Sequence, residues 1–145
     1  MFVDFLTNHY SLDTSQFRLV KTDCFMNESG IFFKNTLHVT RFTLQSLIVV
    51  HDDLDIPFGK FHIQKGVGPQ LHNGLKSIEE NLRSKDFWRV RIGVDARLPN
   101  RWIDGESYVL QNFLTEEKIR LEKEIFPIIL NQLKIFLKTT FSIIF

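Results

Sequence analysis

The chain has 145 residues, of which 43% are hydrophobic and 24% charged, and its formal net charge is +1. This length predicts one domain with its own core, spanning 1–145, and the small net charge gives no global electrostatic reason to bind nucleic acid. A single cysteine excludes an intrachain disulfide and fits a reducing compartment, so we expect a cytoplasmic protein. No stretch predicts a membrane span, and the first ten residues lack the basic region of a signal peptide.

The first half of the chain predicts helical and extended segments in turn. Residues 2–6 have apolar side chains at helical spacing, and FRLVK (17–21) alternates as a short strand does. A helix is predicted from Ser29-Gly30 to about residue 42. The apolar run at 46–50 is typical of a strand buried on both faces, and Ile56-Pro57 predicts a break after it, because proline cannot continue a ladder.

The second half continues this order. KFHIQK (60–65) predicts a half-exposed strand, and a helix is predicted from Asn73 to Leu82. WRVRIGV (88–94) alternates, which predicts that its two arginines, Arg89 and Arg91, point outward.

The last helix is predicted to begin at Thr115, which can cap it, and to kink or restart at Pro127. An apolar tail is expected at about 139–145. Strands that alternate with helices predict an α/β domain with a mixed sheet flanked by helices.

Polar residues crowd the end of the apolar run, in LIVVHDDLDIPFG (47–59). In an extended chain Asp52 points away from His51 and Asp53, so one carboxylate can face a cleft and orient a histidine from elsewhere. A polar turn that closes the strand is the alternative. A metal site is a third possibility, built from hard-to-intermediate ligands: His51, Asp52, Asp55, His62 and His72.

Two loop-to-helix junctions carry amides. Asn73, beside His72, either caps its helix or presents its amide to a ligand at the helix N-terminus. Asn27 in FMNESG (25–30) has the same two readings. Between Lys76 and Arg101, seven basic and four acidic residues leave a local excess of three positive charges, which could meet phosphates or simply face solvent.

Several motifs in order resemble one family. FMNESG, IVVHDDLDIPFG, LHNGLKSIEENL, DFWRVRIGVDAR and YVLQNF together resemble the bacterial-type peptidyl-tRNA hydrolases, from about Phe2 to about Leu133. The resemblance implies hydrolysis of the ester between a peptide and tRNA, which recycles tRNA from aborted translation. It implies no metal or organic cofactor and peptidyl-tRNA as the partner. We also expect no membrane association and a monomer.

The resemblance also implies roles for particular residues. Asp52 matches the aspartate that orients the catalytic histidine, and Asn73 an amide that stabilises the oxyanion and holds substrate. Asn27, and Phe25 as an aromatic lining, match positions that hold the substrate's end. Two basic residues, Arg91 and less surely Lys76, match positions that face tRNA phosphate. His72 matches a histidine beside the site that is not the general base. With Asp52 in the site, Asp53 is interpreted as a turn residue and Asp55 as a surface residue.

The chain departs from this pattern at its start. The family's first strand, its Asn-Pro-Gly turn and the general-base histidine have no counterpart, because Phe2 to Leu6 already resembles the helix that follows them. We therefore expect a sheet without the family's first strand, and impaired activity for these 145 residues. The loop GVGPQLHNG is also poorer in glycine than in most of the family. Two alternatives stay open: a non-catalytic tRNA 3′-end binding protein of the same fold, and a metal-assisted hydrolase using His51, Asp52 and His72.

Overall fold

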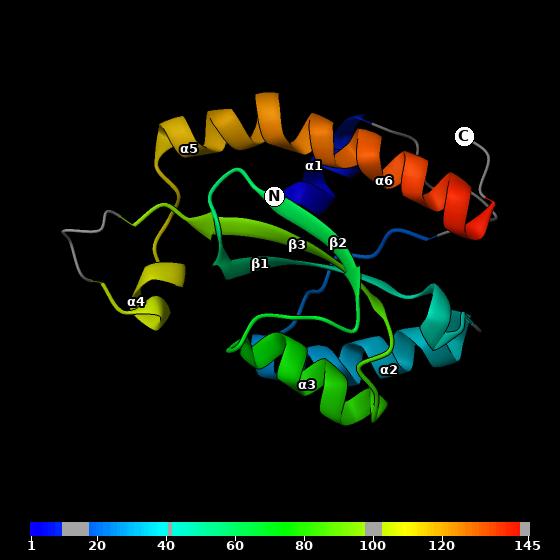
Figure 1. Cartoon of the computed structure of the whole chain (residues 1–145). Coiled ribbons are helices and arrows are strands. Elements are labelled where there is room, and N and C mark those ends of the chain that lie inside the picture. Colours follow the sequence, from blue (N-terminus) through cyan, green and yellow to red (C-terminus); the bar gives the residue numbers. More distant parts are fainter. Residues whose placement is uncertain (10–17, 41, 98–102, 143–145) are drawn as a thin grey trace. The chain divides into compact units, whose positions relative to one another are not determined.

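The computed structural model describes residues 1–9, 18–40, 42–97 and 103–142. They divide into two compact units (Figure 1). One is Thr22–Ala96, which holds the sheet, and the other combines Met1–Lys21 with Arg97–Phe145.

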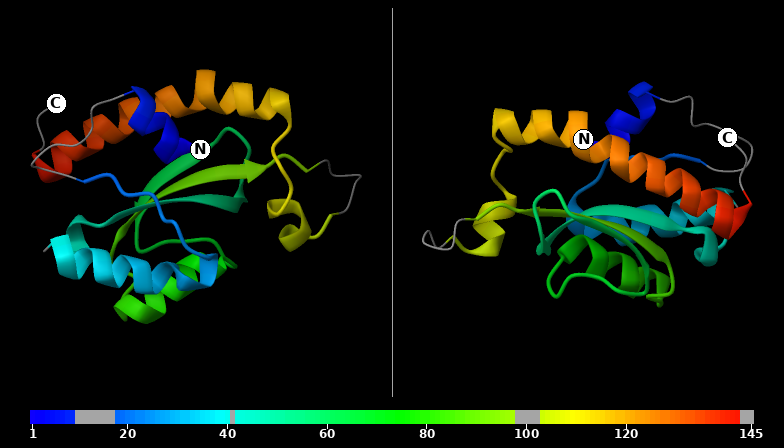
Figure 2. Two further views of the ribbon diagram at one scale, coloured as in Figure 1. Left: turned by 180° about the vertical axis from the view of Figure 1, so that it is seen from behind. Right: turned by 45° about the horizontal axis from the view of Figure 1, so that its top comes forward.

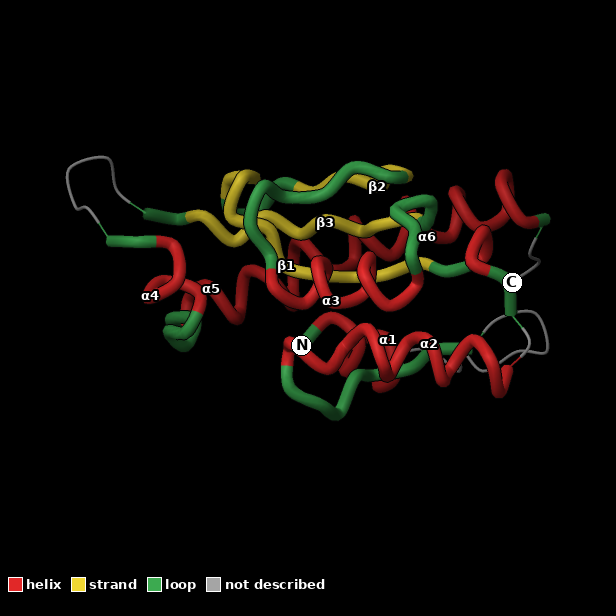
Figure 3. Tube along the Cα trace, turned by 90° about the horizontal axis from the view of Figure 1, so that it is seen from below, coloured by secondary structure: helices red, strands yellow, loops and turns green. Residues whose placement is uncertain are grey.

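The Thr22–Ala96 unit is built on a three-stranded mixed sheet. Its strands are β1 (Ile48–Pro57), β2 (Phe61–Lys65) and β3 (Trp88–Asp95). Figure 3 shows β3 between the other two; β1 is parallel to it and β2 antiparallel. The α/β class and the mixed sheet are thus confirmed. The predicted break at Ile56-Pro57 is confirmed, because β1 continues through the polar segment and ends at Pro57.

Gly93 lets the end of β1 cross β3. A Cβ at Gly93 would lie 2.3 Å from the carbonyl oxygen of Pro57 and 2.6 Å from Cγ2 of Ile56. Beyond this crossing the chain turns at 57–60, where Lys60 N–H donates to the Pro57 carbonyl and Gly59 has a φ of 85°. This is a conformation that glycine adopts without steric cost.

Two helices cover one face of this sheet: α2 (Ser29–Thr40) and α3 (Asn73–Leu82). Figure 2 shows them side by side. Short 3-10 turns, η1 (Met26–Glu28) and η2 (Leu44–Ser46), precede α2 and β1. The apolar core between helices and sheet consists of Val49, Leu75, Ile78 and Phe87, with Phe33, Leu44, Leu47 and Leu82 around it. The predicted bounds of α3 are confirmed, and α2 ends two residues before the predicted position.

The arginines of β3 do not point to solvent. The strand was predicted correctly, but Arg89 is 0% exposed and Arg91 8% exposed, and the residues from Arg89 to Val94 are all buried. Arg89 is held by Glu79 of α3 at 2.9 Å and lies over the Phe87 ring. The alternation was misleading because each guanidinium has a carboxylate to pair with, which allows both to be buried.

The other unit is helical in the part of it that is described. It contains α1 (Phe2–His9), α4 (Gly105–Val109), α5 (Thr115–Arg120), the π-helical turn η3 (Leu121–Ile125) and α6 (Phe126–Phe141). Aromatic rings join α1 to α6, since Phe126 lies 5.1 Å from Phe2 and 5.5 Å from Phe5 between ring centroids. The buried residues of α6 recur at helical spacing: Phe126, Ile129, Leu130, Leu133 and Leu137.

Two expectations for this unit are corrected. Residues 18–21 form no strand, and Phe17 lies outside the described residues. Leu114, not Thr115, is the N-cap of α5, where Glu117 accepts a hydrogen bond from Leu114 N–H at 2.8 Å. The restart predicted at Pro127 is confirmed, because Pro127 stands in the first turn of α6, and that helix includes residues 139–141 of the expected tail. None of the helices in the described part of the chain is long and apolar enough to cross a membrane.

Candidate active site

His72 and Asp52 meet where β1 faces the start of α3. His72, not Asn73, is the N-cap of α3, and its Nδ1 accepts a hydrogen bond from Leu75 N–H at 3.1 Å. Its Nε2 lies 3.5 Å from Oδ1 of Asp52, within ion-pair distance but without forming a hydrogen bond. Asn73 is therefore the first residue of the helix, and its exposed side chain is not used for capping.

The cap fixes the tautomer of His72. A nitrogen that accepts from a backbone N–H carries no proton, so neutral His72 has its proton on Nε2, on the side of Asp52. His72 can therefore donate toward the carboxylate. It cannot accept a proton at Nδ1 without breaking the cap, which argues against His72 as a general base.

Asp52 remains accessible while staying charged. Its side chain is 46% exposed. The interaction with His72 lowers the pKa of Asp52, and this outweighs the opposing effect of burial. A carboxylate that is both ionised and accessible can accept a hydrogen bond from an imidazole and so orient it.

His51 has the opposite character. It is 8% exposed, its Nδ1 lies 2.6 Å from the carbonyl oxygen of Asp52, and its ring packs edge-to-face on His72 at 5.1 Å. Nδ1 therefore carries the proton and Nε2 is left with a lone pair. Burial lowers the pKa of His51 to about 4, so its ring is neutral and a weak base at neutral pH.

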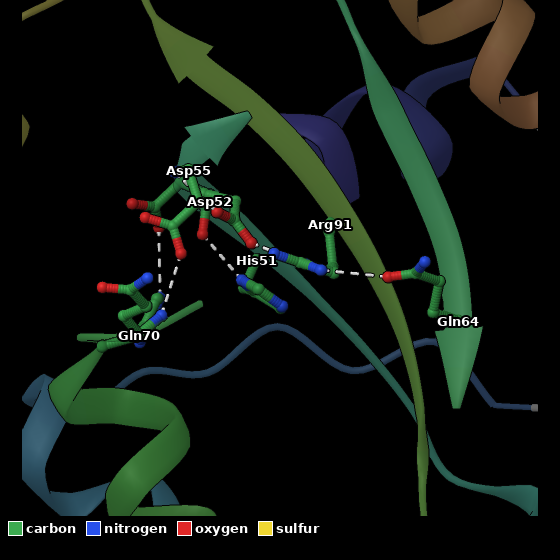
Figure 4. A network of polar contacts seen from close by, with 8 residues as sticks. His51, Asp52, Asp55, Gln64, Gln70 and Arg91 are labelled. Atoms are coloured by element: carbon green, nitrogen blue, oxygen red, sulfur yellow. Dashed lines mark hydrogen bonds and ion pairs between the residues drawn. The ribbon is translucent and has the colours of Figure 1, made fainter. Parts of the chain in front are cut away.

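Asp53 and Arg91 form a buried ion pair beside this pair of histidines. Figure 4 shows Arg91 reaching toward Gln64 of β2. Its Nε donates to Oδ2 of Asp53 at 2.7 Å, and its Nη1 donates to Gln64 at 2.9 Å. The interpretation of Asp53 as a turn residue is wrong, because it is 1% exposed and holds β1 to β3. Contact of Arg91 with phosphate stays a prediction.

Asp55 anchors the loop that leads into α3. One of its oxygens accepts from the backbone N–H of Gln70 at 2.9 Å, and its own N–H donates to Asp53 (Figure 4). Asp55 was interpreted as a surface residue, and it is exposed. It also restrains the loop 66–71 directly before His72, a role that the sequence spacing did not indicate.

Two of the predicted substrate-holding residues stand beside α3. Asn27 lies in η1 and is exposed, and Phe25, its N-cap, is 79% exposed. A Cβ at Gly74 would lie 3.0 Å from Cγ of Met26 and 3.1 Å from Cε1 of His72. Gly74 therefore allows η1 to pack on the first turn of α3, close to His72.

The predicted basic patch contains fewer exposed cations than the count of basic residues between Lys76 and Arg101 suggested. Arg89 and Arg91 are buried in ion pairs, and Arg101 lies outside the described residues. Lys76 on α3 is exposed, and a shallow depression at the end of the helix is lined by Lys76, Glu79, Glu80, Arg83, Ser84 and Lys85. Within the part of the chain that is described, no three His, Cys, Asp or Glu residues gather as a metal-binding group.

The comparisons with known proteins agree with this architecture. A mixed sheet with a polar site beside a helix N-terminus defines an α/β protein, and the family model for peptidyl-tRNA hydrolase matches residues 3–143. The chain belongs to the peptidyl-tRNA hydrolase family.

Among curated relatives, the peptidyl-tRNA hydrolase of Geotalea uraniireducens is 44% identical over 105 residues, which is 72% of this chain and 53% of that protein. The one from Lawsonia intracellularis is 39% identical over 120 residues, 83% of this chain and 59% of that protein. The chain thus spans little more than half the length of these relatives.

A solved structure supports the fold. The crystal structure of peptidyl-tRNA hydrolase from Acinetobacter baumannii matches with a TM-score of 0.64 at 21% identity, covering 90% of this chain and 81% of that one. At this identity the likeness concerns the fold alone.

Proposed function

We propose that this chain acts on peptidyl-tRNA, holding its 3′ end while the ester between peptide and tRNA is hydrolysed, and so recycles tRNA from aborted translation. The observation that carries the proposal is the pairing of accessible Asp52 with His72 at the start of α3, with Asn73 exposed next to them. The family assignment supplies the substrate class.

Each site residue has a role in this proposal. Asp52, kept ionised, is suited to orient a catalytic histidine. Neither His51 nor His72 fills that role. The amide of Asn73 donates to the oxyanion as the ester carbon becomes tetrahedral, where the N-terminus of α3 adds favourable potential. The remaining predicted contacts are to the substrate's end for Phe25 and Asn27, and to tRNA phosphate for Lys76 and Arg91.

We infer that residues 1–145 by themselves turn over slowly. His51 is buried with a pKa lowered to about 4, and His72 is committed to its cap, so neither is placed to activate water. A missing general base costs about two to four powers of ten in rate. We further propose that the chain forms one monomeric, cytoplasmic domain that needs no cofactor.

The second candidate is a tRNA 3′-end binding protein without turnover. It is favoured by the same observation, because exposed Asn27, Asn73 and Lys76 stand around a site whose two described histidines are both engaged. A metal-assisted mechanism through His51, Asp52 and His72 has less support, since these residues do not form a metal-binding group.

The test measures binding and cleavage on one preparation. Filter binding of N-acetyl-aminoacyl-tRNA over a salt series should give an affinity that falls with salt, and single-turnover assays should give slow but measurable ester cleavage. Binding without cleavage above the spontaneous rate would favour the second candidate. Absence of binding at low salt would contradict both the hydrolase and the tRNA-binding candidate. Cleavage that is lost with EDTA and restored by metal would support the metal-assisted mechanism.

A further inference from the structure

Ser77 connects α3 to the loop that carries Asn27. Its hydroxyl donates to the carbonyl oxygen of Asn27 at 2.6 Å and accepts from the backbone N–H of Gly30 at 3.1 Å. Both partners are about fifty positions away in the sequence. Ser77 is 7% exposed and lies one turn after Asn73 on the same helix.

The start of α2 and the middle of α3 pack tightly at this contact. A Cβ at Gly30 would lie 2.0 Å from the backbone oxygen of Ser77, so the start of α2 meets α3 backbone to backbone. The side-chain amide of Asn81 donates a hydrogen bond to this backbone oxygen of Ser77 at 2.9 Å. The serine hydroxyl is therefore the polar link in an otherwise tight helix crossing.

We propose that Ser77 is a positioning residue that sets where Asn27 stands relative to Asn73. This inference rests on the proposed function, because it gives Asn27 and Asn73 a shared ligand. Ser77 fixes the backbone carbonyl of Asn27, and α3 carries Asn73 one turn earlier, so one helix sets the spacing of both amides. The ligand that the side-chain amides of Asn27 and Asn73 would bind together is the 3′ end of an acylated RNA.

Removal of the hydroxyl has a local effect. In Ser77→Ala the Asn27 carbonyl and the buried Gly30 N–H both lose their partner, and the 3-10 turn η1 is freed to shift. Asn27 itself keeps its chemistry, and Asn73 keeps its place at the first turn of α3. The variant therefore weakens ligand binding through Asn27 and not through Asn73.

A double-mutant cycle tests this. The probe is an acceptor-stem RNA ending in CCA that carries an N-acetylated amino acid through a 3′-amide, which resists cleavage. We expect Ser77→Ala to weaken binding about fivefold, the value of one ordinary hydrogen bond. In an Asn27→Ala background the same change should have no further effect. Ser84→Ala, at an exposed hydroxyl after α3, should bind as the unmodified chain does.

A second variant covers the case in which Ser77→Ala fails to fold. Ser77→Cys keeps the size of the side chain with a weaker donor, and should give a smaller loss that also vanishes with Asn27→Ala. Equal losses in both backgrounds, or none in either, would overturn the proposal for Ser77 while leaving the proposed function intact. An unmodified chain that does not bind the probe would overturn the proposed function and this inference with it.

Discussion

Arg91 on β3 donates from Nε to Oδ2 of Asp53 on β1 at 2.7 Å, and the Asp53 side chain is completely buried. The pair joins the parallel strands next to His51 and Asp52, both of which approach His72. It therefore fixes the backbone from which Asp52 reaches the site.

Removing the cation should destabilise the chain strongly. Arg91→Met leaves Asp53 charged and without its partner in a buried place, which costs about 3–5 kcal/mol in comparable pairs. The free energy of unfolding in urea measures it. Adding Asp53→Asn should recover part of the loss, because the buried charge is then gone.

An exposed ion pair at the end of β2 gives the control. Lys65 lies 3.0 Å from Asp86, whose side chain is 60% exposed, so Lys65→Met should change stability by no more than about 1 kcal/mol. Similar losses for Lys65→Met and Arg91→Met would show that burial of the Asp53 pair has no energetic weight.

His51 should make stability fall as the pH is lowered. Its pKa is about 4 in the folded chain and 6.5 as an ordinary histidine, so between these values unfolding takes up a proton and low pH favours the unfolded state. The loss approaches about 3 kcal/mol near pH 4. His51→Gln should lack this component, so the difference in unfolding free energy between the two proteins should narrow or reverse from pH 7 to pH 4. A constant difference would contradict it.

Two variants separate the roles of His72. His72→Asn keeps a good N-cap but removes the imidazole, and His72→Ala removes both. NMR titration of the Asp52 carboxyl should show its pKa rising toward 3.8 in each, because the interaction with His72 holds it low. Only the alanine variant should also lose about 1 kcal/mol of stability. An unchanged Asp52 pKa would show that His72 does not support its ionisation.

The crossing of β1 over β3 predicts a contrast between two glycines. A Cβ at Gly93 would meet backbone at 2.3 Å, whereas at Gly68 the nearest atoms are at 3.5 Å, an ordinary contact. Gly93→Ala should cost about 1–3 kcal/mol or more in thermal or urea unfolding. Gly68→Ala should be nearly neutral. Equal effects would mean that the crossing relaxes freely.

The sequence predicted the elements with strong periodicity and missed what depends on pairing across the sheet. The helix from Asn73 to Leu82 follows from local spacing, and so does the mixed α/β class. Burial of Arg91 could not be predicted from its strand, because the carboxylate that permits it is 38 positions away. For the same reason Asp53 resembled a turn residue.

The site was predicted in the same uneven way. Spacing and resemblance indicated Asp52, Asn27 and Asn73, but not that His72 takes the cap from Asn73 and approaches Asp52. The role of Ser77 in binding the Asn27 loop needed the packing of α2 on α3, which no local pattern reports.

The most direct test of the central claim is the single-turnover rate of ester cleavage in N-acetyl-aminoacyl-tRNA, for the unmodified chain, Asn73→Ala and Asn35→Ala. Asn35 is an exposed amide on α2 and serves as the matched control. The account predicts cleavage above the spontaneous rate, a loss of about 10²–10³-fold or down to the spontaneous rate for Asn73→Ala, and none for Asn35→Ala. Cleavage that is undiminished in Asn73→Ala would contradict it.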